Sequence, residues 1–193
     1  MKDRAHPVWP AYEEFNQSNP SALYDGMKNT IETIWKLGQL GKDPLRNRRL
    51  RLGLNTNNSW GSIYKDLVSG EIIQYFDAHI TEEVLRAYHG AGDGNSLKKP
   101  ARVSLALALG LLDSCGDQTL HVGDTLNDLK ASRKVIRLNP QFPENILTVG
   151  ACYGYEGRER LGQGIVTADR ERVNFDYLID KPKELVDIVK ELL

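Results

Sequence analysis

The stretch Thr119-Leu-His-Val-Gly123-Asp124-Thr-Leu-Asn-Asp128 contains the strongest fold signal in this sequence. Its first five residues are mostly apolar and end at a glycine, which predicts a short buried strand over 119–123. Helical periodicity follows over 127–138, so one aspartate stands where the strand ends and a second stands across the start of the helix. A strand that leads directly into a helix is the repeating unit of a parallel α/β sheet.

The same alternation extends to both sides of this stretch. Strands are expected over 50–56, 72–76, 119–123 and 145–150, and helices over 26–38, 59–69, 81–88, 100–112, 127–138 and 181–193. Strands that alternate with helices form right-handed crossover units. The sequence therefore predicts an α/β fold of the Rossmann-like, three-layer α/β/α kind, with a mostly parallel sheet covered on both faces.

Composition narrows the functional classes. The 193 residues carry 25 Lys+Arg against 26 Asp+Glu, and the net charge of −1 disfavours a nucleic-acid partner. Cys115 and Cys152 stand far apart without a Cys-x-x-Cys motif, which favours a reducing compartment. The longest apolar run, Leu105 to Leu112, is too short for a membrane span. We expect a soluble cytoplasmic protein with no membrane partner, and homo-oligomer formation stays open.

The first 22 residues differ from the rest of the chain. Pro7, Pro10 and Pro20 stand there among Asn, Gln and Ser residues, which predicts an irregular lead-in. Residues 23–193 are then expected to form one core domain.

Candidate functional residues follow the predicted strands. Thr56 follows the strand over 50–56, Lys99 precedes Pro100, and Asp124 and Asp128 flank a helix start. Taken alone, each is usually a turn residue, a surface charge or a helix cap. Ligands of parallel sheets bind beyond the carboxyl ends of the strands, so we expect these residues to converge there. Two carboxylates suit Mg²⁺, while a lysine, a hydroxyl and helix N-termini suit phosphate.

These motifs resemble those of the haloacid dehalogenase (HAD) superfamily, whose members are mostly Mg²⁺-dependent phosphatases on a Rossmann-like sheet. Leu52-Gly-Leu-Asn-Thr-Asn57 is similar to the second motif of the family. Lys99-Pro100 is similar to the third motif, and Gly123-Asp124-Thr-Leu-Asn-Asp128 is similar to the fourth. The similarity covers about residues 23–193. It implies a HAD core with little or no cap.

The resemblance also implies roles for single residues. Thr56 and Asn57 would bind the substrate phosphate together with Lys99, which would neutralise its charge. Lys98 is an alternative to Lys99, although the adjacent proline favours Lys99. Asp124 and Asp128 would hold Mg²⁺. The expected substrate is a small phosphorylated metabolite, as in members of the phosphoglycolate-phosphatase type.

One departure from the family concerns the nucleophile. The first motif of the family is Asp-x-Asp on the central strand, and its leading carboxylate attacks phosphorus. No such motif occurs before position 50, where the acidic residues are Asp3, Glu13, Glu14, Asp25, Glu32 and Asp43. Covalent phosphoryl transfer lacks its nucleophile, and Mg²⁺ binding is expected to be weak or absent.

Two functional hypotheses remain open. In the first, the chain is a phosphatase core, inactive because the sequence begins after the first motif. In the second, it is a complete, non-catalytic binding or interaction module with the HAD fold. Retention of Thr56, Lys99, Asp124 and Asp128 favours the first hypothesis, since a module long free of catalysis has no chemical reason to keep all four.

The missing motif also has a structural consequence. In the family, its strand lies between those matched here by 50–56 and 119–123, and each buried backbone group left unpaired costs about 1–3 kcal/mol. We expect these two strands to pair directly in a contracted sheet. The alternative is that another chain supplies the missing strand. A regular central strand at residues 5–15 would overturn both.

Further residues are weaker candidates. Cys152 has no local catalytic partner and is expected to pack as a small apolar side chain. Tyr153, Tyr155 and Arg158 follow the strand over 145–150 and are expected to border the site.

Overall fold

A computed structural model of the protein describes residues 14, 15, 18, 21–40, 50–92, 94–114, 119–136 and 146–193. The basic loop at 41–49 and most of the predicted irregular lead-in at 1–22 lie outside these ranges. Within the lead-in, Glu14, Phe15 and Ser18 are helical.

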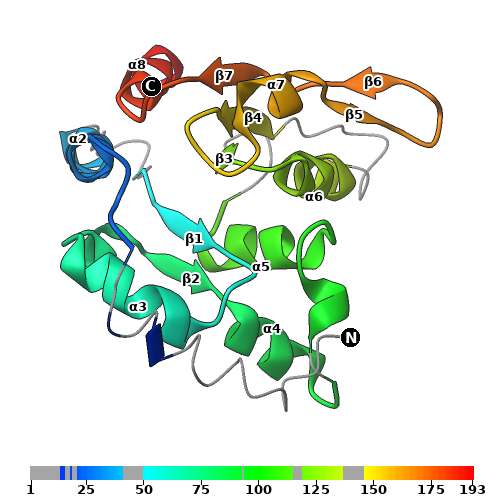
Figure 1. Cartoon of the computed structure of the whole chain (residues 1–193), viewed down its shortest axis with the longest axis horizontal. Coiled ribbons are helices and arrows are strands. Elements are labelled where there is room, and N and C mark those ends of the chain that lie inside the picture. Colours follow the sequence, from blue (N-terminus) through cyan, green and yellow to red (C-terminus); the bar gives the residue numbers. More distant parts are fainter. Residues whose placement is uncertain are drawn as a thin grey trace.

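The strands within these ranges form two parallel sheets and one antiparallel hairpin (Figure 1). The first sheet pairs β1 (Gly53–Asn55) with β2 (Ala78–Ile80), and Gly53 lies opposite Ala78. The second has the order β3-β4-β7, built from β3 (Leu120–Gly123), β4 (Leu147–Ala151) and β7 (Tyr177–Ile179). The hairpin joins β5 (Ile165–Val166) to β6 (Arg172–Val173).

Helices connect and cover these strands. The α-helices are α2 (Met27–Leu40), α3 (Trp60–Ser69), α4 (Glu82–His89), α5 (Val103–Leu111), α6 (Leu126–Ile136), α7 (Gly157–Gly162) and α8 (Glu184–Leu192). Short 3₁₀ turns occur at η1 (Ile73–Tyr75) and η2 (Asn95–Leu97). The boundary of α3 follows from its sequence, because the Ser59 hydroxyl accepts a hydrogen bond from the Ser62 amide and caps the first turn.

Alternate residues of the three-stranded sheet face two different helical layers. On β7, Ile179 packs with Ile188 of α8, whereas Leu178 packs against a cluster that includes Leu129 of α6 and Leu161 of α7. Successive strand residues point to opposite faces of a sheet, so α8 covers one face and α6 with α7 the other. The predicted α/β/α layering is confirmed for this sheet.

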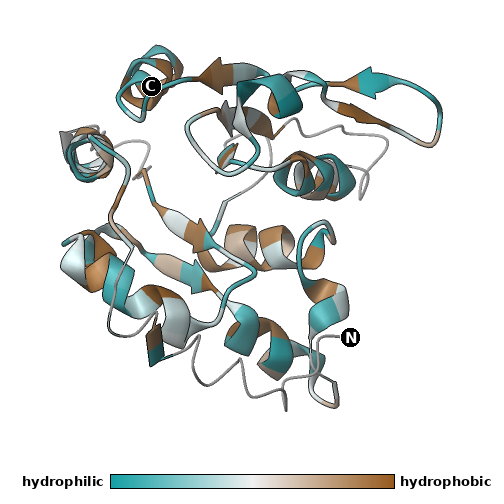
Figure 2. Ribbon diagram, in the orientation of Figure 1, coloured by the Kyte–Doolittle hydropathy of each residue, from teal (hydrophilic) through white to brown (hydrophobic). Residues whose placement is uncertain are grey.

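Helix α5 connects the two sheets. It has no charged residue and is white and brown along its length in Figure 2. One set of its side chains packs with the first sheet, where Ala108 contacts Ile80. Another set, Leu105 and Leu109, packs with Val135 of α6. No helix within the described ranges is both long and apolar enough to cross a membrane.

Two local predictions are wrong. The strand expected at 72–76 is the 3₁₀ turn η1, in which the Tyr75 amide donates to the Ile72 carbonyl at 3.1 Å, and the strand lies instead at β2. Only Ile72 of that apolar run is buried. Gly38 does not end α2, which continues to Leu40. Its missing side chain instead allows Leu50 to approach the helix closely.

The predicted direct pairing of the strands over 50–56 and 119–123 is also wrong. Strand β1 pairs with β2 and strand β3 with β4, and the two belong to different sheets. Residues 5–13 lie outside the described part of the chain, and Glu14 and Phe15 are helical.

Two hydrogen bonds of the buried Thr148 hydroxyl with Asp176 predict how a substitution at Thr148 changes stability. The fully buried Thr148 donates its hydroxyl to Asp176 Oδ2 at 2.7 Å and accepts from the Asp176 amide at 3.2 Å. We expect Thr148→Val to lower the free energy of unfolding by about 1–2 kcal/mol, because two groups lose a partner. Urea unfolding measures this. The exposed control Ser69→Ala should stay within about 0.5 kcal/mol of the parent, and equal effects of the two variants would contradict the expectation.

Candidate functional site

The Lys99 side chain connects the end of β1 to helix α6, which packs against β3. Its ammonium donates to the Asn55 carbonyl, at the end of β1, at 2.8 Å and to Asp128 Oδ1, on α6, at 2.7 Å. The two side chains are largely buried, with 13% of Lys99 and 4% of Asp128 exposed. An ammonium has three donors. The third N–H of Lys99 has no hydrogen-bond partner among the residues that the structure describes.

The neighbouring lysine lies in a different ion pair. Lys98 Nζ contacts Glu82 Oε2 at 2.9 Å, and Glu82 also pairs with Arg86 of its own helix. Of the two lysines considered from the sequence, Lys99 is therefore the one that reaches Asp128.

A double hydrogen bond fixes the backbone of Lys99. The side-chain amide of Asn57 donates to the Lys99 carbonyl at 3.0 Å, and its oxygen accepts from the Lys99 amide at 2.8 Å. Thr56 lies beside it, with its amide bonded to the Ile80 carbonyl and its hydroxyl accepting from the Asn58 amide at 3.1 Å. Asn57 thus positions Lys99, a function that sequence reasoning missed. The roles of Thr56 and Asn57 as phosphate ligands stay predictions.

Asp128 is held by contacts on both carboxylate oxygens. Its Oδ2 accepts from the Thr125 amide at 3.1 Å and from the Thr125 hydroxyl at 2.7 Å, while Oδ1 accepts from Lys99. Burial raises the pKa of Asp128, but the charge and hydrogen bonds of Lys99 outweigh burial and leave the pKa below its usual value. The carboxylate is therefore ionised at neutral pH.

A buried, neutral histidine lies close to this ion pair. Burial lowers the pKa of His121 to about 4, and its Nδ1 lies 2.6 Å from the Ser132 hydroxyl. His121 adds no positive charge to the site at neutral pH.

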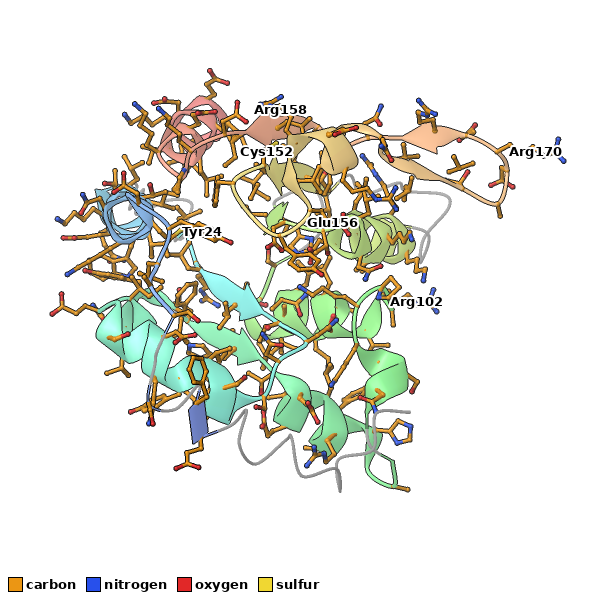
Figure 3. The ribbon with its side chains drawn as sticks, in the orientation of Figure 1. Tyr24, Arg102, Cys152, Glu156, Arg158 and Arg170 are labelled. Atoms are coloured by element: carbon orange, nitrogen blue, oxygen red, sulfur yellow. The ribbon has the colours of Figure 1, made fainter. Side chains whose placement is uncertain are left out.

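Asp124 directly follows β3 and is enclosed by the loop after β4. Its Oδ2 accepts from the Tyr155 amide at 3.0 Å, and its carbonyl accepts from the Glu156 amide at 3.2 Å. Glu156 in turn accepts from the Leu126 amide at 2.8 Å and caps the start of α6, beside which it lies in Figure 3. Sequence reasoning did not identify Glu156, because no local pattern links it to α6.

At two glycines, the absence of a side chain allows an aspartate side chain to lie directly against the backbone. A side chain at Gly123 would overlap Asp128, and a side chain at Gly154 would overlap Asp124. Of the four residues expected to converge, Lys99 and Asp128 are in direct contact, while Thr56 directly follows β1 and Asp124 directly follows β3.

The described residues fit a magnesium ion only in part. Mg²⁺ prefers an octahedral shell of oxygen ligands. Asp124 Oδ1 accepts no hydrogen bond from the described residues, whereas both oxygens of Asp128 are engaged. Within the same ranges, no three His, Cys, Asp or Glu residues form a group that could hold a metal. Asp124 is the ligand that this arrangement leaves accessible.

The weaker candidates lie at the edge of the site. Burial raises the pKa of the Cys152 thiol, which keeps it protonated and weakly nucleophilic at neutral pH. Arg158, near Cys152 in Figure 3, binds Asp180 through two contacts of 2.8 Å. Burial raises the pKa of Tyr153 to about 12, and its ring packs on Tyr24 with centroids 5.1 Å apart. Of the three border residues, Tyr155 reaches Asp124, through its backbone.

Comparison with known proteins shows which folds this geometry resembles. No protein-family model matches the sequence. The pyrophosphatase PpaX of Bacillus mycoides is 23% identical over 181 residues, which are 94% of this chain and 67% of PpaX.

Solved structures are similar over most of this chain. They include HAD-hydrolase YfnB of Bacillus subtilis, bound to magnesium, with 16% identity and a TM-score of 0.63 over 94% of this chain and 62% of YfnB. A predicted phosphoglycolate phosphatase from Haemophilus somnus has 22% identity and a TM-score of 0.60 over 93% of this chain and 63% of that one. CbbY of Rhodobacter sphaeroides, in complex with phosphate, has 19% identity and a TM-score of 0.57 over 91% and 61%.

These likenesses identify the fold as that of HAD-superfamily hydrolases. The chain spans less than two thirds of the length of the three solved structures, from 61% to 63%.

The buried Lys99–Asp128 pair predicts a pH-dependent stability effect. We expect Lys99→Met to lower the free energy of unfolding at pH 7 by about 3–5 kcal/mol, because a buried carboxylate loses its cation. The folded-state pKa of Asp128 lies below the ordinary value of a free aspartate carboxyl. The pair therefore stabilises the fold above that value and loses its contribution as pH falls through the folded-state pKa. The difference between variant and parent should shrink at acid pH.

Urea unfolding across a pH series measures this effect. The double variant Lys99→Met with Asp128→Leu should recover part of the loss, since no unpaired charge remains. A loss that is equal at neutral and acid pH would show that lost packing, and not charge, is responsible.

The close contact at Gly123 predicts opposite effects for two glycine variants. Gly123→Ala should lower the free energy of unfolding by about 1–3 kcal/mol, because the new methyl group overlaps Asp128. Gly61→Ala is the matched control, since nothing lies within 4 Å of a side chain there, and it should stabilise exposed helix α3 by about 0.5–1 kcal/mol. Thermal unfolding measures both. A stabilising Gly123→Ala would contradict the site geometry.

Proposed function

We propose that this chain binds the phosphate group of a small phosphorylated molecule beyond the carboxyl ends of β1 and β3, without hydrolysing it at the rate of a phosphatase. The observation that carries this proposal is the fixed ammonium of Lys99 at the carboxyl end of β1, whose third N–H has no hydrogen-bond partner among the described residues. Helix α6 begins next to this point, since Asp128 lies in its first turn, and a helix N-terminus favours anions.

The charges of the site imply that a cation assists binding. Lys99 contributes one positive charge, and Asp124 and Asp128 contribute two negative charges, so these three side chains sum to −1. An anion is therefore not attracted by side-chain charge alone. A Mg²⁺ ion on Asp124 Oδ1 would neutralise both that carboxylate and the phosphate. We propose that such an ion binds weakly, because the described residues supply too few further ligands.

Binding without turnover follows from the side chains present. The sequence contains no Asp-x-Asp motif. Asp128 is held by Lys99 and Thr125, and the Cys152 thiol stays protonated, so neither is an activated nucleophile. YfnB was solved bound to magnesium and CbbY with phosphate, which supports a site for both ligands on this fold. The cytoplasmic location and the metabolite class of the ligand stay predictions.

The proposal is tested by titrating inorganic phosphate into ¹⁵N-labelled protein with and without Mg²⁺. We expect saturable shifts of the Asn58, Thr125 and Leu126 amides that are stronger with Mg²⁺. Asp124→Ala should remove the effect of Mg²⁺, while the exposed control Glu191→Ala should not. The absence of saturable shifts would favour the alternative, a non-catalytic interaction module with no phosphate site.

Turnover is assayed on the same protein with a chromogenic phosphate ester and Mg²⁺. We expect no hydrolysis above that of a blank. Hydrolysis that Asp124→Ala abolishes would contradict the proposal, because it would show that the site carries its own nucleophile.

A further inference from the structure

Three tyrosine side chains form an aromatic patch beside Asp124. Tyr155 donates its backbone amide to Asp124 Oδ2 at 3.0 Å, and the residue is 86% exposed. Tyr24 is 50% exposed, and its ring packs edge-on against the ring of Tyr153, with centroids 5.1 Å apart. Burial raises the pKa of Tyr153 and the charge of Asp124 raises it further, so the Tyr153 phenol lies close to the same carboxylate. The aromatic patch is therefore Tyr24, Tyr153 and Tyr155.

The loop after β4 holds two of these tyrosines in place. A side chain at Gly154, which separates Tyr153 from Tyr155, would overlap the Asp124 side chain. The Gly154 amide also donates to the Ala151 carbonyl at 3.0 Å. A tyrosine ring moves about only two side-chain torsions, so a ring on a fixed backbone loses little conformational freedom on binding. Tyr155 therefore carries an exposed ring on a backbone that is anchored to Asp124.

Exposure alone does not distinguish Tyr155. Single apolar side chains are common on protein surfaces, and Tyr88 on α4 is also 64% exposed. The difference is the contact of Tyr155 with Asp124, the residue proposed to hold the cation of the phosphate site. A ligand bound through its phosphate to that cation would therefore lie next to the aromatic patch.

The charges of the site favour a ligand that also binds through an uncharged part. The side chains of Lys99, Asp124 and Asp128 sum to −1, so their charge does not attract a phosphate anion. Tyrosine phenols are neutral at pH 7. A planar aromatic ring of a ligand gains stacking energy on the face of such a side chain without any charge of its own. The organic part of the ligand is thus expected to supply affinity that the phosphate does not receive.

We infer that the ligand of this site is a phosphate ester with an aromatic ring in its organic part, and that this ring stacks on Tyr155, with Tyr24 and Tyr153 forming the adjoining surface. The inference rests on the proposed phosphate site, to which it adds the class of ligand. A nucleoside monophosphate has both a phosphate and a flat base, so adenosine 5′-monophosphate (AMP) is the probe. Ribose 5-phosphate is the matched probe that lacks the base.

Titration of the ¹⁵N-labelled full chain in the presence of Mg²⁺ tests the inference. The probes are inorganic phosphate, ribose 5-phosphate and AMP, and the amides of Thr125 and Tyr155 report binding. We expect AMP to bind the parent protein about tenfold more tightly than ribose 5-phosphate, because stacking of one base on one aromatic ring contributes affinity of that order. The Tyr155 amide should shift more with AMP than with ribose 5-phosphate.

Variants of Tyr155 separate the contribution of its ring from that of its backbone. Tyr155→Ala should weaken AMP binding about tenfold and leave ribose 5-phosphate binding unchanged, since the backbone amide that bonds to Asp124 remains. Tyr155→Phe should keep the preference for AMP, because the ring remains. Tyr88→Ala is the matched control, since it removes a similarly exposed tyrosine from α4 and should change neither affinity.

The outcomes distinguish this inference from the proposal on which it rests. The absence of saturable shifts with all three probes would contradict the phosphate site, and this inference with it. Binding of phosphate and ribose 5-phosphate without a preference for AMP would overturn this inference alone. A preference for AMP that persists in Tyr155→Ala would show that the base binds elsewhere, and equal weakening of all three probes would show that Tyr155 acts by positioning Asp124. Either result would also overturn the inference.

Discussion

The contact of one largely buried ammonium with the end of β1 and with helix α6 is the constraint on which the site depends. Lys99 joins the Asn55 carbonyl, at the end of β1, to Asp128 on α6, the helix that packs against β3. Removal of a charge from water is unfavourable, so the ammonium is stable there only because its partners are close and fixed. Asn57 fixes the lysine backbone and Thr125 fixes the carboxylate. The local geometry of both strand ends therefore converges on a single side chain.

The sequence predicted the parts of this arrangement that are encoded locally. Helical periodicity located α3 and α6, and the aspartates of Gly123-Asp124-Thr-Leu-Asn-Asp128 stand at a strand end because the chain turns from strand to helix there. Lys99 was distinguished from Lys98 by the adjacent proline alone. The structure adds a physical reason, since Glu82 already neutralises Lys98.

The parts that the sequence did not predict depend on contacts between distant segments. The apolar run at 72–76 has strand-like composition, yet β1 finds its partner at Ala78–Ile80, and nothing local distinguishes the two. The hydrogen bond between the Asn57 side chain and the Lys99 backbone joins residues that are far apart in the sequence, and so does the bond between Glu156 and the first turn of α6. No spacing rule therefore reveals them. The hairpin β5–β6 and strand β7 are short, and strands of two or three residues leave little periodicity to detect.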